Sequence, residues 1–395
     1  MPNRLLSGAE TLAEDLIELR RDLHRHPELG FQEHRTAGEV ARRLRDAGLD
    51  VQEGVAGTGV VTEIGHGPGP TVLLRADMDA LPIQEDADHD YASENPGVMH
   101  ACGHDGHTAG LVGAARLLAA EAAEGRLPAG RVRLVFQPCE ETVGPDGRSG
   151  AMRLLEEGVL EGVDAALGLH IASNGPAGIF LVGPGPVMGA AQEVEVRVRG
   201  RSAHAAFPHE GIDALVLAAQ GVVATQTAVS RRIPPTEAGV VTFGEIHGGT
   251  AGNVVADEVR LRGTIRSFRP EVHDALVEGL RGAFRGLEAQ GAEVSIDLLT
   301  PFPAVNNDPA VAAELARALR ETFGEERVHP QPALLTAEDF GVISGAVPSA
   351  FFWLGGALAE PRAHHHPRFD FDERVLPMGA AAMAAGAVRL LRSLA

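Results

Sequence analysis

The sequence lacks lysine and contains few cysteines or large aromatic residues. All 34 basic residues are arginines, and the 395 residues include only 2 cysteines, 1 tryptophan and 1 tyrosine. The lack of lysine excludes Schiff-base chemistry and the lysine of a phosphate-binding loop. Two cysteines in so long a chain do not form a disulfide framework, so we expect a cytoplasmic protein.

Positive charge and long apolar runs are also scarce. The chain has 54 acidic residues and a formal net charge of -20 at pH 7. We expect no nucleic-acid partner and no binding to anionic membranes, because both would repel this charge. No stretch approaches the ~18 uninterrupted apolar residues of a membrane helix. The N-terminal segment also shows no features of a secretion signal.

The order of expected elements predicts an α/β fold with more than one domain, on a prior of ~150 residues per domain. In the first half of the chain we expect strands at 60–64, 71–75, 132–136 and 165–170, and helices at about 11–26, 36–47, 106–123 and 149–157. Alternating strands and helices predict a mixed, largely parallel sheet covered by helices on both faces.

A second pattern interrupts this alternation between residues 188 and 299. Its order is strand, helix, two strands, helix and strand, which is the ferredoxin-like arrangement. Proline-rich segments at 183–186 and 301–303 flank it. After residue 303 the α/β pattern resumes. We therefore expect a discontinuous catalytic domain, 1–187 and 300–395, with an inserted βαββαβ domain at 188–299.

The segment His100-Ala101-Cys102-Gly103-His104-Asp105-Gly106-His107 carries the first candidate metal ligands. Cys102 and His104 stand just before an expected helix, whose N-terminus favours a thiolate. A soft thiolate with an imidazole suits zinc. The alternative is a buried cysteine with solvated histidines, and we do not expect His100 or His107 to be ligands.

Glu140 and Glu141 follow an apolar strand and form the second candidate pair. Neighbouring carboxylates there diverge, so one can bind a metal ion while the other faces substrate and water. A metal-bound water has its pKa lowered toward ~7, and a nearby carboxylate can take its proton. We expect Glu140 to be the general base and Glu141 the ligand. A solvated pair on a loop is the alternative.

The remaining candidate residues are convincing only in combination with the two motifs above. His170 lies at the end of an apolar strand, and one of the three histidines at 364–366 could be a ligand. Asp79 follows another strand and could orient a metal ligand, or could cap a turn. In the inserted domain, His204 could stabilise charge on a carbonyl oxygen, while Asn253 and Arg266 could bind a substrate carboxylate. Each of these three could equally be a satisfied surface residue.

Taken together, the motifs resemble one family almost from end to end. The chain is similar to the metallo-amidohydrolases that include hippurate hydrolases, N-acyl-amino-acid aminoacylases, auxin–amino-acid conjugate hydrolases and related carboxypeptidases. The matching segments are 20–29, 75–82, 100–107, 136–141, 168–170, 200–208, 263–266, 338–340 and 365–370.

The resemblance implies a site for two divalent metal ions (manganese, zinc, cobalt or nickel) whose ligands are Cys102, His104, Glu141, His170 and His365. It selects His365 because the last ligand of the family stands two residues before a proline. It also implies that Glu140 is the acid/base. The inserted domain resembles a lid and dimerisation domain, in which His204 reaches a site on closure. Homodimers or homotetramers are expected.

Two residues depart from the family pattern without removing a ligand. Cys139 stands where a small apolar residue is common, and His364 replaces the usual apolar residue before the last ligand. The expected reaction is hydrolysis of the amide bond of a small N-acyl amino acid. A dipeptidase or carboxypeptidase is the alternative with the same chemistry. A catalytically silent metal- or amino-acid-binding protein, or an amidase that uses Cys102 as nucleophile, are alternatives of other classes.

Overall fold

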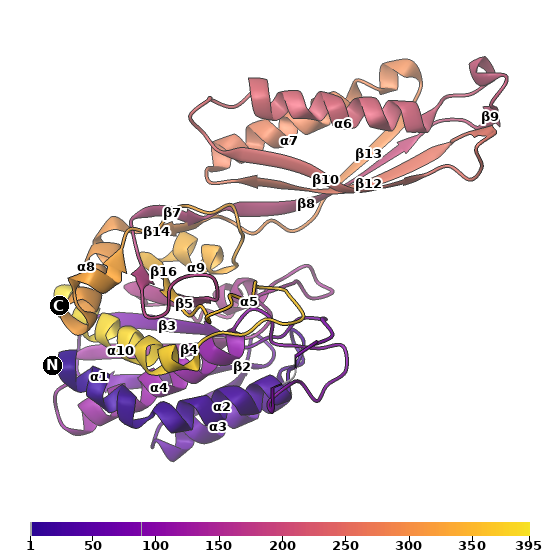
Figure 1. Cartoon of the computed structure of the whole chain (residues 1–395). Coiled ribbons are helices and arrows are strands. Elements are labelled where there is room, and N and C mark those ends of the chain that lie inside the picture. Colours follow the sequence, from indigo (N-terminus) through magenta and orange to yellow (C-terminus); the bar gives the residue numbers. More distant parts are fainter. Residues whose placement is uncertain (1, 88) are drawn as a thin grey trace. The chain divides into compact units, whose positions relative to one another are not determined.

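The chain forms two compact units, which Figure 1 shows as ribbons in this computed structural model. The structure describes residues 2–87 and 89–395. Unit 1 contains the chain up to Val187, together with Val305–Ala333 and Asp339–Ala395. Unit 2 contains Met188–Ala304 and Leu334–Glu338.

The segment Leu334–Glu338 belongs to unit 2, whereas the sequence placed it with the catalytic domain. Its backbone explains the difference. The carbonyl of Thr336 accepts a hydrogen bond from the Gly189 N–H at 2.8 Å, and the carbonyl of Leu335 accepts one from Arg266 at 3.0 Å. These partners, which are distant in sequence, hold the segment against unit 2.

Unit 1 contains a mixed eight-stranded sheet, as the sequence predicted. Its strand order is β1-β2-β4-β3-β5-β16-β6-β15. The central strands β4, β3, β5 and β16 are parallel, whereas β1, β2 and β4 pair antiparallel. The bounds are β1 Val51–Val55, β2 Gly59–His66, β3 Thr71–Asp77, β4 Gly130–Gln137, β5 Ala165–Ala172, β6 Phe180–Leu181, β15 Val328–His329 and β16 Ser349–Gly355.

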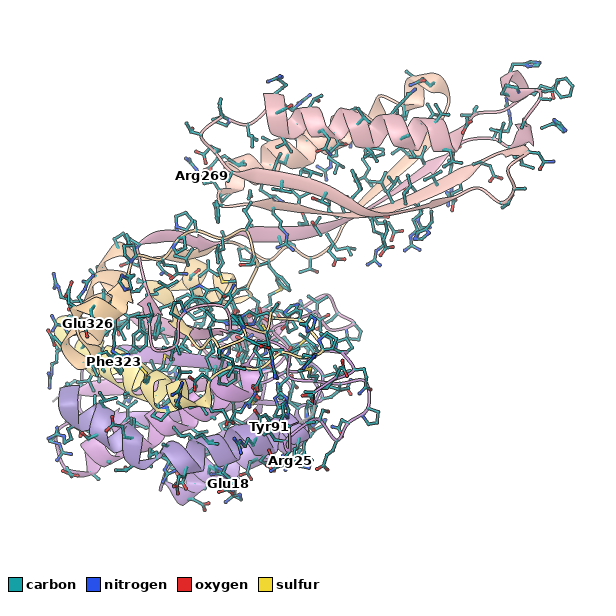
Figure 2. All side chains as sticks on the ribbon, viewed as in Figure 1. Glu18, Arg25, Tyr91, Arg269, Phe323 and Glu326 are labelled. Atoms are coloured by element: carbon teal, nitrogen blue, oxygen red, sulfur yellow. The ribbon has the colours of Figure 1, made fainter. Side chains whose placement is uncertain are left out.

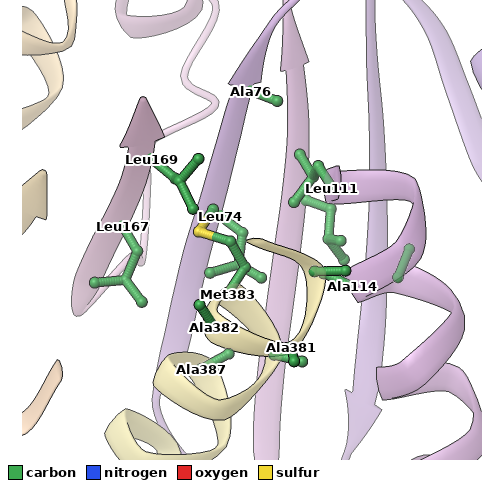
Figure 3. Close-up of a cluster of buried hydrophobic side chains, with 14 of the residues drawn as sticks. Leu74, Ala76, Leu111, Ala114, Leu167, Leu169, Ala381, Ala382, Met383 and Ala387 are labelled. Carbon is green, nitrogen blue, oxygen red and sulfur yellow. The ribbon is translucent and has the colours of Figure 1, made fainter. Parts of the chain in front are cut away.

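Helices cover both faces of this sheet, so β3, β5 and β16 are buried along their whole length. On one face, α4 (His104–Ala123) and α10 (Leu376–Ser393) pack on the strands and on each other. Figure 3 shows Leu74 and Leu169 of the sheet beside Met383 of α10 and Leu111 of α4. The outer helices on this side are α1 Pro2–Thr11, α2 Ala13–Arg25, α3 His34–Asp46 and α8 Pro309–Phe323.

Two short helices, α5 (Gly150–Glu156) and α9 (Phe340–Ala346), lie on the opposite face (Figure 1). The small strands β7 (Gly185–Met188) and β14 (Val305–Asn307) pair with each other. Several short strands, β1 among them, were not predicted, because segments this short carry little periodicity. The helix expected over 11–26 is α2, which begins at Ala13, and a separate helix that was not predicted, α1, precedes it.

One stretch within the described residues, Glu373–Ser393, is long and apolar enough to cross a membrane by length and composition. It contains α10, and 83% of its most apolar window is buried inside the fold. Its contacts with α4, α8 and α1 account for that burial. A helix that is apolar on every side is expected at such a central position.

Unit 2 has the ferredoxin-like arrangement that the sequence predicted. Its elements are β8 Ala190–Arg199, α6 Ala214–Arg231, β10 Gly239–Gly248, β12 Glu258–Ser267, α7 Pro270–Arg285 and β13 Glu293–Leu298. The strands pair antiparallel in the order β10-β12-β8-β13. Val194, Val196 and Val198 alternate along β8 and are buried in the core of this unit. A separate small ladder joins β9 (Ala203–His204) to β11 (Val254–Val255).

Candidate metal centre

The parallel strands β3, β4 and β5 bring the candidate residues of unit 1 to one edge of the sheet. Asp77 ends β3, Glu140 and Glu141 follow β4, and His170 lies near the end of β5. The carboxyl ends of parallel strands meet at the same edge, where α/β proteins bind their ligands. The segment before α4 adds Cys102 to this group.

His104 begins α4 and presents one ring nitrogen to several carboxylates. Gly103, just before it, has φ 98°, a left-handed conformation that glycine adopts without strain. The His104 Nδ1 donates to the backbone carbonyl of Asp79 at 2.9 Å. Within residues 2–87 and 89–395, its Nε2 has no hydrogen-bond partner; it lies 3.7 Å from Asp77, 3.9 Å from Glu140 and 3.8 Å from Glu141.

These carboxylates hold a proton on His104. Burial alone would lower its pKa, but Asp77 and Asp79 raise the pKa of His104 to about 10. Burial alone would raise the pKa of Asp77. The neighbouring His104, Arg75 and His107 instead keep the pKa of Asp77 well below its usual range. Without a metal ion, the Nε2 position of His104 is therefore occupied by a proton at neutral pH.

The two glutamates follow a strained residue, and each directs one carboxylate oxygen toward His104 Nε2. Cys139, just before them, has φ 49°, which is uncommon for a residue with a side chain. The Glu140 Oε1 accepts a hydrogen bond from the Asp339 N–H at 3.3 Å. The Glu141 N–H donates to Asp79 Oδ2 at 3.0 Å. Asp79 therefore contacts both His104 and Glu141, which suits the orienting role expected of it.

Cys102 and His170 face each other, with the thiol sulfur 3.4 Å from His170 Nε2. The other ring nitrogen of His170 donates to the Ile171 carbonyl at 2.8 Å, which leaves Nε2 as the nitrogen directed toward the thiol. Burial and the nearby Glu141 and Glu140 raise the pKa of Cys102 well above its usual range. Burial and His107 lower the pKa of His170, so its imidazole is neutral.

Of the three consecutive histidines, His365 reaches toward Glu141, at 3.2 Å between Nε2 and Oε1. Its backbone has φ 60°, and its N–H donates to the Ala101 carbonyl at 2.8 Å. His366 instead accepts a hydrogen bond from the Arg368 N–H. The half-buried His364 accepts one from the Ser173 N–H at 3.3 Å, and its ring packs against His170. The positive φ of His365 is uncommon for a residue with a side chain, and such conformations often occur at functional sites.

All five expected metal ligands thus lie in one part of unit 1. One candidate ligand atom each from Cys102, Glu141 and His365 lie within 4.8 Å of one another, and the same holds for His104, Glu140 and Glu141. His107 is different, because both of its ring nitrogens are engaged. Its Nδ1 bonds to Asp77 at 2.6 Å, and its Nε2 accepts the Ile171 N–H at 2.9 Å.

A buried arginine organises the carboxylates behind the centre, and the sequence analysis assigned it no role. Arg75 is 1% exposed and donates to Gln137, Asp77 and Asp339 at 2.9, 2.7 and 2.8 Å. Asp339 also accepts hydrogen bonds from Gln137 and from the Ala151 N–H. The only hint in the sequence was that Arg75 and Asp339 fall inside motifs of the resembling family.

A second residue without an assigned role is Glu33, which holds the loop before Glu140. Its carboxylate accepts hydrogen bonds from the Cys139 N–H at 2.9 Å and from the Thr58 hydroxyl at 2.5 Å. Burial and the nearby Asp79 raise the pKa of Glu33 to about 7. No spacing rule predicts this contact, because the partners of Glu33 are far from it in sequence.

The candidate residues of the inserted domain lie in unit 2. His204 is exposed, and its Nδ1 accepts a hydrogen bond from the Ala206 N–H at 3.0 Å. Asn253 is close to it, since His204 pairs with Val254 and the Ala205 N–H donates to the Asn253 carbonyl. Arg266 is on β12, where it pairs with Ala191 and donates to Leu335. His204 and Asn253 are therefore neighbours, whereas Arg266 makes separate contacts.

Replacing Arg75 by methionine should destabilise unit 1 by about 3–5 kcal/mol, because Asp77 and Asp339 would remain buried without their cationic partner. Chemical denaturation followed by circular dichroism measures the loss. Arg374→Met is the matched control, because the Arg374 side chain is 87% exposed beside Asp372. The control should be as stable as the wild type. Equal stabilities of the Arg75 variant and the wild type would show that the buried network contributes little.

Comparison with known proteins gives the family. The sequence profile of peptidase family M20/M25/M40 matches residues 73–388 of this chain. The chain is 37% identical over 385 residues to the N-acetylcysteine deacetylase of Bacillus subtilis, covering 96% of this chain and 97% of the relative. It is 36% identical over 394 residues to thermostable carboxypeptidase 1 of Saccharolobus solfataricus, covering 98% of both.

A solved structure agrees with this match. The YXEP protein of Bacillus subtilis, described as a dinuclear metal binding peptidase of the M20 family, superposes with a TM-score of 0.83 at 33% identity. The match covers 97% of this chain and 99% of that protein. The family resemblance and the enzyme class inferred from the sequence, an amidohydrolase, are confirmed. The chain belongs to peptidase family M20/M25/M40.

Proposed function

We propose that this chain hydrolyses the amide bond of N-acyl amino acids with the help of two divalent metal ions, and releases a carboxylic acid and a free amino acid. The observation that carries the proposal is the convergence of Cys102, His104, Glu141, His170 and His365 beside a second carboxylate, Glu140. The similarity to an N-acetylcysteine deacetylase supports an N-acyl amino acid as substrate.

The chemistry of the site suits two metal ions. His104 Nε2 is buried and has no hydrogen-bond partner among the described residues, and the buried Glu141 Oε1 faces His365 Nε2 at 3.2 Å. Five carboxylates (Asp77, Asp79, Glu140, Glu141 and Asp339) surround a region in which Arg75 is the buried guanidinium. Bound divalent cations would balance this negative charge. A thiolate, imidazoles and carboxylates together suit zinc, cobalt or manganese.

In the proposed mechanism, Glu140 moves the proton. Bound metal ions would lower the pKa of the attacking water and polarise the amide carbonyl. The Asp339 N–H holds Glu140 Oε1, while Oε2 faces the region of His104 and accepts the proton of the water. Glu140 then returns that proton to the leaving amine nitrogen. Asp79 orients His104 and Glu141 through the contacts described above.

Unit 2 would supply the remaining contacts to the substrate. We propose that His204 stabilises the charge that develops on the carbonyl oxygen, and that Asn253 and Arg266 bind the carboxylate of the amino acid. The exposed position of His204 and its proximity to Asn253 support a shared role.

Under this proposal, Asn253→Ala raises the KM for an N-acetyl amino acid and has little effect on the KM for an amide without a carboxylate.

A peptidase activity is the second candidate, supported by the 36% identity to a carboxypeptidase. The same site would then cleave a dipeptide or a C-terminal peptide bond. Kinetics with N-acetyl, N-benzoyl and N-indoleacetyl amino acids, alongside dipeptides and blocked peptides, separate the two. A higher kcat/KM for the acyl amino acids favours the first proposal, and a higher value for the peptides favours the second.

Glu140→Gln should retain both metal ions while kcat falls by a factor of about 10² to 10⁴, because only the proton acceptor is lost. Glu141→Gln is the matched variant and should lose bound metal, because it removes a ligand. Elemental analysis and single-substrate kinetics on both variants give the comparison. Turnover of Glu140→Gln close to that of the wild type would refute its assignment as the base.

Metal binding should release about two protons at pH 7, one from His104 and one from the Cys102 thiol, and a further fraction from His365, whose pKa is raised by Glu141. The pKa of His104 and that of Cys102 lie above neutrality, so both sites are protonated before binding. Metal affinity should therefore rise with pH, and each released proton contributes about tenfold per pH unit below its pKa. Titration calorimetry in buffers of different ionisation enthalpy counts the protons. Cys102→Ser should release about one proton fewer than the wild type. If the wild type released no protons on binding metal, the assignment would be contradicted.

We also propose that the protein forms homodimers or homotetramers through unit 2. Helix α6 exposes Leu215, Val216 and Val223, the last of them 71% exposed. Apolar residues gathered on one helix surface are typical of an interaction site. Val216→Glu with Val223→Glu should give monomers in light scattering, while Leu394→Glu in unit 1, also at an exposed position, should not. A monomeric wild type would exclude this assembly.

We also propose that the protein is cytoplasmic. Its partner would be its small-molecule substrate, and it would bind neither nucleic acid nor a membrane. The proposal is supported by two cysteines that are both buried and free and by the net charge of -20. Cell fractionation tests it, and recovery of the protein from the membrane or secreted fraction would contradict it.

A further inference from the structure

A second group of potential metal ligands lies in unit 1, separate from the five residues of the centre. His24 is in the last turn of α2, and Glu85 and His89 are on the irregular segment that follows β3. One ligand atom from each lies within 4.8 Å of the other two. The Nε2 atoms of His24 and His89 are each 3.2 Å from the same oxygen, Glu85 Oε1.

The surroundings fix these side chains with their ligand atoms directed toward one another. Glu85 Oε2 accepts the Ser93 N–H at 2.6 Å, which leaves Oε1 facing the two imidazoles. The other nitrogen of His24, Nδ1, lies 2.8 Å from Asp105, which the Arg20 guanidinium also holds at 2.8 Å. A carboxylate behind a histidine orients the ring and raises its basicity toward a metal ion.

His89 is the residue that distinguishes a ligand site from an ordinary ion pair. Its ring stacks on Tyr91, labelled in Figure 2, with a centroid distance of 3.8 Å, so its plane is fixed. Both of its ring nitrogens are buried; Nε2 contacts Glu85 Oε1 at 3.2 Å, and Nδ1 has no hydrogen-bond partner among the described residues. His89 thus adds a second imidazole nitrogen to the Glu85 oxygen that already faces His24, and this set of three donors around one point is what a single cation can hold in common.

We propose that His24, Glu85 and His89 bind a third divalent transition-metal ion, with zinc as the best match. Ligand atoms ~2.0–2.1 Å from a tetrahedral zinc ion lie ~3.3 Å apart, close to the 3.2 Å separations seen here. Two imidazoles and one carboxylate suit zinc or iron(II) better than magnesium. The His89 side chain is 14% exposed, which gives an ion access and leaves a position for water.

Such an ion would join the end of α2 to the segment that carries Glu85 and His89. That segment contains no helix or strand in its described residues, so a metal cross-link would be a substantial constraint on it. The site would thus stabilise the fold, and hydrolysis would not require His89.

Metal counting on the full-length protein tests the site. After removal of metal with a chelator and reloading with zinc, the wild type should retain about three ions per chain after desalting. His89→Gln and Glu85→Gln should each retain one ion fewer, and His209→Gln, at an exposed position in unit 2, should match the wild type. Parallel loading with iron(II) without oxygen, and with magnesium, identifies the preferred class of ion.

The result is the difference in bound metal between the wild type and His89→Gln. This difference does not depend on whether the two-ion centre is filled. A difference of one ion, with a smaller zinc-induced rise in melting temperature and unchanged hydrolysis, supports the site. Equal metal contents and equal rises in melting temperature in the wild type and both variants would show that the cluster is an ion pair only. Circular dichroism of the metal-free variants confirms folding, and Glu85→Gln serves if His89→Gln does not fold.

Discussion

The buried guanidinium of Arg75 is the interaction on which the rest of the centre depends. It lies between Asp77 at the end of β3 and Asp339 before α9, and it also contacts Gln137 at the end of β4. A buried charge is tolerated only when it is paired and hydrogen-bonded, and Arg75 meets both conditions through three side chains. Through Asp339, whose N–H holds Glu140, this contact connects the core of the sheet to the proposed proton acceptor.

Negative charge is the second constraint. The fold places carboxylates on two neighbouring chain segments around one buried imidazole, and that imidazole holds a proton as a result. Such an arrangement is costly for a fold alone, because like charges repel and desolvated carboxylates lose their hydration. It is favourable when cations bind there. The uncommon backbone conformations at Cys139 and His365 indicate that the fold holds both segments against local strain.

Much of this could be predicted from the sequence, for identifiable reasons. The strands around 71–75 and 165–170 are apolar throughout, and the inserted segment shows the order of a ferredoxin-like unit, so the fold class and the main elements followed from periodicity. Cys102 and His104 could be named because they stand before an expected helix, and Glu141 and His170 because they follow or end a strand; the complete set of five came from the family resemblance. The choice of His365 over His364 and His366 came from the family resemblance, not from spacing.

Other features depend on contacts between segments that are distant in sequence. Glu33 reaches Cys139, and Thr336 joins unit 2 by a backbone hydrogen bond, but neither has a local pattern that would reveal it. Likewise, nothing in the spacing of His24, Glu85 and His89 suggests a common site. The helix expected over 11–26 matches α2 to within two residues, as is usual for helix ends, whereas α1 before it was not predicted.

The most direct test of the account is a crystal structure of the metal-loaded enzyme with anomalous diffraction recorded at the absorption edge of the bound metal. The account predicts two peaks in unit 1, enclosed by Cys102, His104, Glu141, His170 and His365, with Glu140 beside them but not bound to either ion. A single peak among these five ligands, or two peaks beside them coordinated by other side chains, would contradict it; a further peak at His24, Glu85 and His89 would belong to the separately proposed third ion.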